Sequence, residues 1–346
     1  MNQFERAFEC YDTALSFAPN DAEIHYNRAV MYHSLQQFDQ ALTCYDQAIA
    51  VNPQHANSYW NKASLHLIQG QYELGWLFYE WRWKIEKGPR KRSFSQPRWL
   101  GDQALDGKTI LLYNEQGMGD TLQFCRYVPQ VKALGATVIL AVDELLENLV
   151  KNSPLGMDML LTGGSLIPHF DFHCPILSLP LALRCFTEQA IPRNVPYLFA
   201  LQDKVLAWCN KLGPRTKPRV GLVWNGGQHL EQQKAIRARR DIAFGLIARL
   251  NRPDIDFYSL QKGEPAESEL VTTHAQHWQG DNFHVFTQHI YDFSDTAALI
   301  YHLDLVIAVD TSTAHLAGAM GKPVWLLNRF DSCWRWLLGR DDSPWY

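Results

Sequence analysis

The chain has 346 residues, enough for two or three domains at roughly 150 residues each. Lys and Arg (32 residues) nearly balance Asp and Glu (36 residues), so the formal net charge of −4 excludes the strongly basic composition typical of nucleic-acid-binding proteins. Hydrophobic residues make up 47% of the chain, an ordinary globular proportion, yet no apolar run approaches the ~18 residues that a membrane-spanning helix needs.

The cysteines and the first residues of the chain bear on its cellular compartment. The seven cysteines are scattered and never spaced as CxxC, which argues against a disulfide framework and against a zinc–thiolate site. The segment from Met1 to Arg6 lacks the basic and then apolar layout of a signal peptide. We therefore expect a cytoplasmic protein.

An internal repeat occupies the N-terminal quarter of the chain. A shift of 34 residues superimposes residues of the same kind: Phe4, Phe38 and Tyr72; Ala7, Ala41 and Gly75; Tyr11, Tyr45 and Tyr79; Pro19 and Pro53. This period is that of the tetratricopeptide repeat, a helix–turn–helix unit in which small residues mark close helix contacts. We predict about 2.5 repeats over residues 1–88, serving either to bind a peptide-like partner or as scaffolding.

The third repeat departs from the pattern, because Arg82 replaces the expected alanine and tryptophans crowd its last helix. Terminal repeats often cap a stack or pack against a neighbouring domain. We predict that the segment from Gly75 to Trp83 docks onto the next domain, and the alternative is an exposed aromatic helix. Residues 89–106 are expected to form a solvated linker that includes the basic stretch ending at Arg92.

From Lys108 onward, short apolar runs alternate with helical stretches, as in βαβ units. The predicted strands are Thr109–Tyr113, Thr137–Val142, Val220–Trp224, Asp256–Leu260, Leu305–Val309 and Pro323–Leu327. The predicted helices lie near 120–134, 143–151, 241–250, 294–303 and 312–320. This pattern predicts two doubly wound parallel-sheet lobes, an N-lobe (107–210) and a C-lobe (211–346), with ligands beyond the carboxyl ends of the strands.

The first strand is followed by a glycine-containing turn with the sequence Asn114-Glu115-Gln116-Gly117-Met118-Gly119-Asp120. Gly117 and Gly119 allow a tight turn and a close approach of the backbone to a ligand. Asp120 begins the next helix, where it either caps free backbone N–H groups or holds a carboxylate at the cleft, placed to take a proton from a hydroxyl. Spacing alone leaves both interpretations open.

Two strand ends of the predicted C-lobe carry candidate phosphate-binding residues. One has Asn225 and Gly226 in a turn before the cations Lys234, Arg237, Arg239 and Arg240, which suit a phosphate or form a solvated loop. The other runs from Asp310 through Thr311, Ser312 and Thr313 to His315. The free N–H groups and partial positive charge of a helix N-terminus suit a diphosphate there, and simple capping with a hydrogen-bonded histidine is the alternative.

Other patterns are weaker. Asp254 and Asp256 match a metal-binding DxD pattern but are expected to form a turn. His169 and His173 lack a third ligand and are expected on the surface, so no metal site is predicted. Leu122 stands where a dinucleotide-binding fingerprint needs its third glycine.

The sequence resembles bacterial tetratricopeptide-repeat proteins with a glycosyltransferase family 9 (heptosyltransferase-like) domain. The resemblance rests on the residues Asn114–Phe124, Asp310–Pro323, Gly75–Trp83 and Leu260–Gly263, which include Gln261. It implies a GT-B fold with an acceptor, protein or glycan, on the N-lobe and a nucleotide-sugar donor on the C-lobe. It further implies metal-independent, inverting transfer without a cofactor, and Asp120 as the base.

Two departures from that family qualify the expectation. Ser312 replaces a glycine at the helix entry, and the chain stops at Tyr346, where GT-B proteins usually continue into helices that cross back to the N-lobe. We therefore expect a truncated C-lobe: either the chain is a fragment of a longer protein, or closure of the lobes is compromised. The competing hypothesis is a non-catalytic, repeat-based interaction scaffold with a vestigial GT-B domain.

Overall fold

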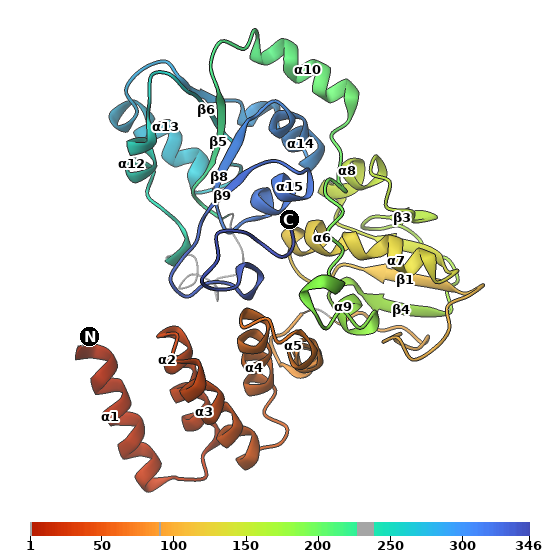
Figure 1. Ribbon diagram of the computed structural model, residues 1–346, viewed down its shortest axis with the longest axis vertical. Helices are drawn as coiled ribbons and strands as arrows, with labels where there is room; N and C mark the ends of the chain where they lie inside the picture. The colour runs from red at the N-terminus through yellow and green to blue at the C-terminus, as the bar shows by residue number, and fades with distance from the viewer. Residues whose placement is uncertain (1, 90, 227–238) are drawn as a thin grey trace.

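The computed structural model describes residues 2–89, 91–226 and 239–346. Helical repeats form one end of the molecule, and two sheet-containing lobes lie side by side beyond them (Figure 1). The expected fold class is confirmed: tetratricopeptide-like helix pairs precede two lobes of parallel strands and helices, the arrangement of the GT-B fold. Among the described residues, none of the helices combines the length and the apolar character needed to cross a bilayer.

The repeats are stacked pairs of helices. Their elements are α1 Asn2–Phe17, α2 Ala22–Ser34, α3 Phe38–Val51, α4 Ala56–Ile68, α5 Tyr72–Tyr79 and the 3₁₀ helix η1 Glu80–Lys84. The small residues Ala29, Ala41 and Ala63 are fully buried where neighbouring helices pack. Their methyl groups allow this close approach, as the 34-residue period predicts.

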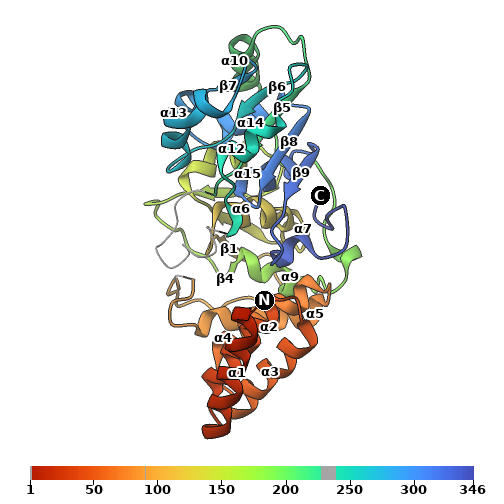
Figure 2. The same ribbon diagram turned by 90° about the vertical axis from the view of Figure 1, so that its left-hand side faces the viewer.

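The third repeat docks onto the rest of the protein, as predicted. Trp76 is 1% exposed, and its ring lies edge-on to rings from both lobes. These rings are Phe124 at 6.0 Å, Trp334 at 5.3 Å and Trp345 at 6.3 Å between centroids. Figure 2 shows the repeats lying beneath the two lobes. Trp81 is an exception, since it stacks on Tyr59 within the repeats (3.7 Å).

The N-lobe sheet has the strand order β3-β2-β1-β4, with parallel pairing throughout. Its strands are β1 Thr109–Tyr113, β2 Thr137–Ala141, β3 Met159–Leu161 and β4 Phe172–Pro175. Its helical elements are α6 Met118–Phe124, η2 Cys125–Tyr127, α7 Val128–Ala133, η3 Glu144–Leu146, α8 Glu147–Lys151, η4 Ile176–Ser178, α9 Leu179–Ala182 and η5 Glu188–Ala190.

The C-lobe sheet has the order β7-β6-β5-β8-β9, again parallel. Its strands are β5 Arg219–Val223, β6 Asp256–Ser259, β7 Phe283–Val285, β8 Leu305–Val309 and β9 Val324–Leu327. Its helical elements are α10 Gln202–Leu212, α12 Phe244–Ile247, η7 Ala248–Leu250, α13 Ala266–His277, η8 Thr287–His289, α14 Phe293–Tyr301, α15 Ser312–Ala319 and η9 Trp334–Trp336.

Two sequence-based expectations about buried residues are wrong. His173 is not on the surface but 8% exposed within β4, a strand too short to give a clear pattern. Residues 89–106 do not form a wholly solvated linker, because Trp99 and Leu105 are each 2% exposed in the main core. Both side chains are large and apolar, and burial removes them from water.

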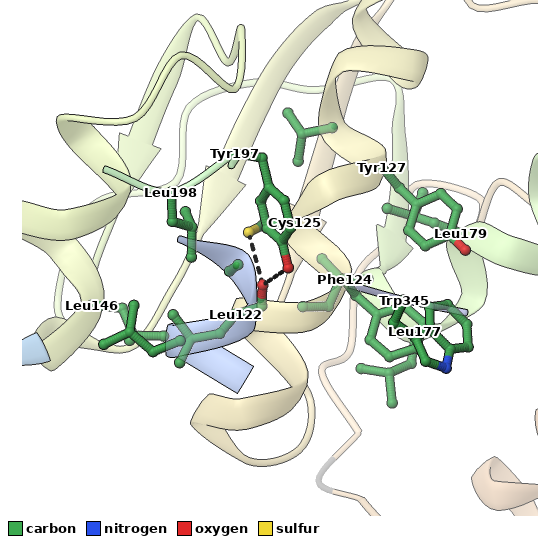
Figure 3. Packing of buried hydrophobic residues seen from close by; sticks show 14 of the residues in the cluster. Leu122, Phe124, Cys125, Tyr127, Leu146, Leu177, Leu179, Tyr197, Leu198 and Trp345 are labelled. Carbon is green, nitrogen blue, oxygen red and sulfur yellow. Dashed lines mark hydrogen bonds between the residues drawn. The ribbon is translucent and has the colours of Figure 1, made fainter. Parts of the chain in front are cut away.

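The two lobes are held together, contrary to the expectation of compromised closure. The segment from Trp334 to Tyr346 crosses back onto the N-lobe, where Trp345 is 1% exposed and packs near Phe124 (Figure 3). The buried Arg126 guanidinium donates to the Trp345 carbonyl and to the Tyr197 hydroxyl (2.6 Å). This segment therefore closes the lobes from within the described chain.

Candidate functional site

The glycine-containing loop after β1 leads directly into α6. Gly117 is the N-cap of this helix, and its N–H donates to Asp120 Oδ2 over 2.9 Å. Asp120 Oδ1 forms an ion pair with Arg335, a residue of η9 that sequence reasoning missed. Both interpretations of Asp120 therefore have a structural counterpart: it satisfies a backbone donor, and it lies at the junction of the lobes.

Gly119 serves a close contact between lobes. A Cβ at Gly119 would lie 3.0 Å from His315 Cδ2 and 3.3 Å from Ser312 Cα, both on α15 of the C-lobe. The missing side chain lets α6 and α15 touch at their first turns. The close approach expected of Gly119 is thus made by another helix of the protein.

A cavity of about 240 Å³ lies between the lobes at the carboxyl ends of the C-lobe strands. Asn225, Gln261, Thr311, Ser312 and Thr313 line it. These predicted donor-site residues follow β5, β6 and β8, and parallel strands bring their ends to the same edge.

Met118 and Leu145 complete the cavity wall from the N-lobe. Pockets that enclose a small molecule usually measure roughly 300–1,000 Å³, so the closed lobes leave a small space.

The first turn of α15 lines this cavity and contains backbone donors without a partner in the helix. Thr311 is the N-cap, in an extended conformation, and the first helical bond runs from the His315 N–H to the Thr311 carbonyl. The N–H groups of Ser312 and Thr313 consequently have no partner within the helix. Thr311 Oγ1 is buried without a hydrogen bond among the described residues.

Gln261 supports the site rather than offering its own amide. Gln261 is 3% exposed, and its Oε1 accepts the N–H groups of Trp224 (3.3 Å) and Asn225 (3.0 Å), while its Nε2 donates to the Asn225 carbonyl (2.9 Å). These bonds fix the turn after β5. The side-chain oxygen of Asn225 is buried and, within the described part of the chain, has no hydrogen-bond partner.

The loops after β5 and β8 are joined by Arg240, which contacts Gly226 and Asp310. The Arg240 guanidinium lies against Gly226, where a Cβ would meet its Nη2 at 1.8 Å, and its Nη1 donates to the Asp310 carbonyl (3.3 Å). Gly226 is required for this approach. The predicted cations Lys234 and Arg237 lie outside the described residues, and Arg239 pairs with Asp331 (2.7 Å).

His315 is a buried, neutral packing residue. Its ring stacks on Trp336 at 5.0 Å, and its Nδ1 lies 2.8 Å from the Tyr346 hydroxyl. Burial, together with the nearby Arg335 guanidinium, lowers the pKa of His315 to about 3. His315 is therefore a hydrogen-bonded histidine within the protein, and its Nε2 lies 3.8 Å from Asp310 Oδ1.

A second cavity, of about 800 Å³, lies beyond the carboxyl ends of β1, β2 and β3 in the N-lobe. Its lining includes Arg92, Asn114, Glu115, Gln116 and Thr162. Arg92 donates to Asn114 Oδ1 (3.1 Å) and lies over the Tyr113 ring. Sequence reasoning placed Arg92 in a solvated linker, although its place in a basic run was a usable signal.

Glu115 is the most perturbed carboxyl group of this region. Burial raises the pKa of Glu115 to about 7, although the adjacent Arg82 guanidinium acts to lower it. Both side chains are 0% exposed, with Arg82 Nη2 3.0 Å from Glu115 Oε1. Within the described ranges, no group of three or more His, Cys, Asp or Glu side chains is arranged to hold a metal ion.

Family comparisons identify the N-terminal region. The tetratricopeptide repeat model matches residues 22–55, and a second TPR repeat model matches residues 1–36. The N-terminal helices are tetratricopeptide repeats. These tetratricopeptide repeats end in the aromatic segment that docks onto both lobes.

Comparison with other proteins extends over the lobes. Protein FlbA of Caulobacter vibrioides is 31% identical over 309 residues, covering 81% of this chain and 49% of FlbA, so the chain spans about half the length of that relative. The glycosyl transferase family 9 structure from Veillonella parvula matches with a TM-score of 0.46 and 14% identity, over 65% of this chain and 81% of that chain.

The structure of the E. coli ADP-heptose lps heptosyltransferase II matches with a TM-score of 0.43 and 13% identity, over 63% of this chain and 84% of that chain.

Proposed function

We propose that this protein is a cytoplasmic glycosyltransferase that moves a sugar from a nucleoside-diphosphate sugar to a hydroxyl of a protein or glycan acceptor. The observation that carries the proposal is the cavity between the lobes, lined by Asn225 and by the first turn of α15. A buried amide oxygen without a partner suits a hydroxyl or N–H of the donor. The free N–H groups of α15 suit its diphosphate.

The proposed chemistry divides between the lobes. Asp120 takes the proton from the acceptor hydroxyl, whose oxygen attacks the anomeric carbon and inverts it as the nucleoside diphosphate leaves. The N–H groups at 311–313 stabilise the charge on the leaving diphosphate, so we propose that the reaction requires no metal. In the closed structure Arg335 pairs with Asp120 Oδ1, and this positive charge lowers the basicity of the proposed base.

Replacing Asp120 tests its proposed role. We expect Asp120→Asn to lower turnover by ~100-fold or more and to leave nucleoside diphosphate affinity nearly unchanged, because the amide cannot accept the proton. The assay follows nucleoside diphosphate released from a panel of UDP-, GDP- and ADP-sugars, with EDTA present. Asp254→Asn is the matched control, since Asp254 is exposed and pairs with Arg252. Equal turnover in both variants removes Asp120 from the mechanism.

Replacing Thr313 tests the diphosphate site. Thr313→Val keeps the side-chain volume and deletes one hydroxyl beside the cavity, so we expect nucleoside diphosphate binding to weaken by about 1–3 kcal/mol, roughly 5- to 150-fold in Kd. Calorimetry with UDP, GDP and ADP in EDTA measures this. Thr121→Val is the control, because Thr121 is a buried threonine on α6 that does not line this cavity. Unchanged affinity would exclude Thr313, and binding that vanishes in EDTA would exclude a metal-free site.

A non-catalytic scaffold is the second candidate, favoured by one observation. Both carboxylate oxygens of Asp120 are engaged, one by Gly117 and the other by Arg335. A platform that binds a nucleotide without turnover is compatible with this arrangement. Sugar transfer or donor hydrolysis with any donor of the panel excludes it.

A further inference from the structure

The polar side chains of the glycine-containing loop are bonded to the tetratricopeptide repeats. Arg82 Nη2 lies 3.0 Å from Glu115 Oε1, and Gln116 Nε2 donates to the Tyr79 hydroxyl over 3.1 Å. Tyr79 is 1% exposed and Arg82 0% exposed, so water does not compete for these bonds. Two consecutive loop residues are therefore held by two residues of the third repeat.

Arg82 is itself held through both terminal nitrogens of its guanidinium, whereas its Nε has no hydrogen-bond partner among the described residues. Its Nη1 donates to the Tyr79 carbonyl (3.1 Å) and to Glu80 Oε1 (2.7 Å), and its Nη2 also donates to Ser178 Oγ (2.7 Å). Ser178 belongs to the N-lobe and donates in turn to Glu80 (2.6 Å). The guanidinium thus joins the repeat, the loop and the N-lobe in one buried network.

The glycine-containing loop contributes to the proposed site in two ways. Glu115 and Gln116 line the 800 Å³ cavity of the N-lobe, and the chain continues through Gly117, the N-cap of the helix that carries Asp120. Ordering backbone residues costs conformational entropy, and a loop with Gly117 and Gly119 loses more freedom than most. Contacts that fix this loop beforehand place a reacting group without that cost during the reaction.

We propose that Tyr79 and Arg82 are positioning residues for transfer, so that the third repeat forms part of the acceptor side rather than a separate binding module. This inference rests on the proposed function. The ordinary alternative is that both residues only attach the repeats to the lobes. Attachment alone changes stability, whereas positioning changes turnover and the order of the loop in a folded protein.

The first experiment compares two buried tyrosines. Tyr79→Phe deletes the hydroxyl bonded to Gln116, and Tyr45→Phe makes the same change in the second repeat. Tyr45 is 0% exposed, and its hydroxyl lies 3.4 Å from His33 Nδ1, within the repeats. We expect Tyr79→Phe to lower the kcat for donor turnover about 5- to 10-fold at unchanged UDP, GDP and ADP affinity, and Tyr45→Phe to change neither. Equal kcat in both variants overturns the inference.

The second experiment asks whether the charge of Arg82 suffices. Arg82→Lys keeps one cationic donor for Glu115 but loses the planar fork, so we expect kcat to fall and affinity for the three diphosphates to persist. Arg28→Met, which breaks the ion pair with Asp12 in the repeats, is the control. A parallel fall of kcat and thermal stability in both variants assigns Arg82 to attachment and overturns the inference.

Hydrogen–deuterium exchange separates failure of this inference from failure of the proposed function. If the parent protein turns over none of the donors, the proposed function fails, but exchange at residues 114–120 still reports the order of the loop. We expect at least 5-fold faster exchange there in Tyr79→Phe and Arg82→Lys than in the two controls. Exchange equal to that of the controls overturns the inference, whatever the activity.

Discussion

The loop and helix from Asn114 to Phe124 meet the tetratricopeptide repeats on one side and the C-lobe on the other, through the same chemistry. Arg82 pairs with Glu115 on the repeat side, and Arg335 pairs with Asp120 on the C-lobe side. The side chains of the first pair are both 0% exposed, whereas those of the second are 12% and 15% exposed. The first pair is dry, whereas the second is partly accessible to water, so we expect its charges to be better screened.

The largest expected effect comes from breaking each pair in turn. Arg82→Met leaves the Glu115 carboxyl buried without its cation, so we expect a loss of about 3–5 kcal/mol in the free energy of unfolding. Arg335→Met removes a pair that solvent reaches, and we expect about 1–2 kcal/mol. Urea denaturation of both variants measures the two losses. Losses of equal size would contradict the distinction between a dry and an accessible pair.

Glu115, on the repeat side of the loop, and His315, on the C-lobe side, should change the free energy of unfolding with pH in opposite directions. The pKa of Glu115 is raised to about 7 in the folded protein, so between about 4.5 and 7 the folded state binds the extra proton and stability falls as pH rises. The pKa of His315 is lowered to about 3, so from about 6.5 down to about 3 the unfolded state binds the proton and stability falls as pH falls.

Two variants separate these contributions. Glu115→Gln should remove the loss of stability that accompanies a rise in pH toward 7. His315→Gln should reduce the loss of stability that accompanies a fall in pH, by up to ~1.4 kcal/mol per pH unit. Free energies of unfolding measured from pH 4.5 to 8 test both. His33, another buried histidine with its pKa lowered to about 4 by burial, keeps an acid slope in either variant. A His315→Gln profile parallel to that of the parent would rule out the neutral, buried state of His315.

What the sequence predicts well in this protein is local. Asn225 and Thr311 follow apolar runs closely, and the rule that parallel strands end at one edge is enough to bring them to one cavity. Gln261, which lines the same cavity, was indicated only by the family resemblance. The 34-residue period likewise predicts the stacked helices, because each repeat contacts mainly its neighbour.

The contacts that hold the proposed catalytic loop are not local. Asp120 and Arg335 are separated by 215 positions, and Glu115 and Arg82 by 33, across a domain junction. Neither pairing has a periodic signal, because each depends on how whole domains close. The strands β3 and β7 have three residues each, too few for an alternating or continuous apolar pattern to stand out. The sequence analysis singled out Asn114, Glu115 and Gln116 of the N-lobe cavity, but it missed the part of the wall formed by residues after β3 and by the supposed linker.

The smallest expected effect comes from adding a single methyl group at the contact between α6 and α15 of the C-lobe. Gly119→Ala places a Cβ 3.0 Å from His315 Cδ2 and 3.3 Å from Ser312 Cα, which is too tight for the closed lobes without a small shift. Overpacking usually costs about 1–3 kcal/mol, and the better helix propensity of alanine returns up to ~1 kcal/mol, so we expect a net loss of about 1 kcal/mol.

Gly163→Ala is the control, because nothing lies within 4 Å of the added Cβ at that N-lobe loop position. If α6 and α15 must separate for a donor to enter, the shift in Gly119→Ala also favours the open form. Nucleoside diphosphate association should then become faster than in Gly163→Ala, while the Arg82–Glu115 pair and the exchange rates of residues 114–116 stay unchanged. Stopped-flow binding of UDP, GDP and ADP measures this, and an equal association rate in both variants would show that contact between these two helices does not limit entry.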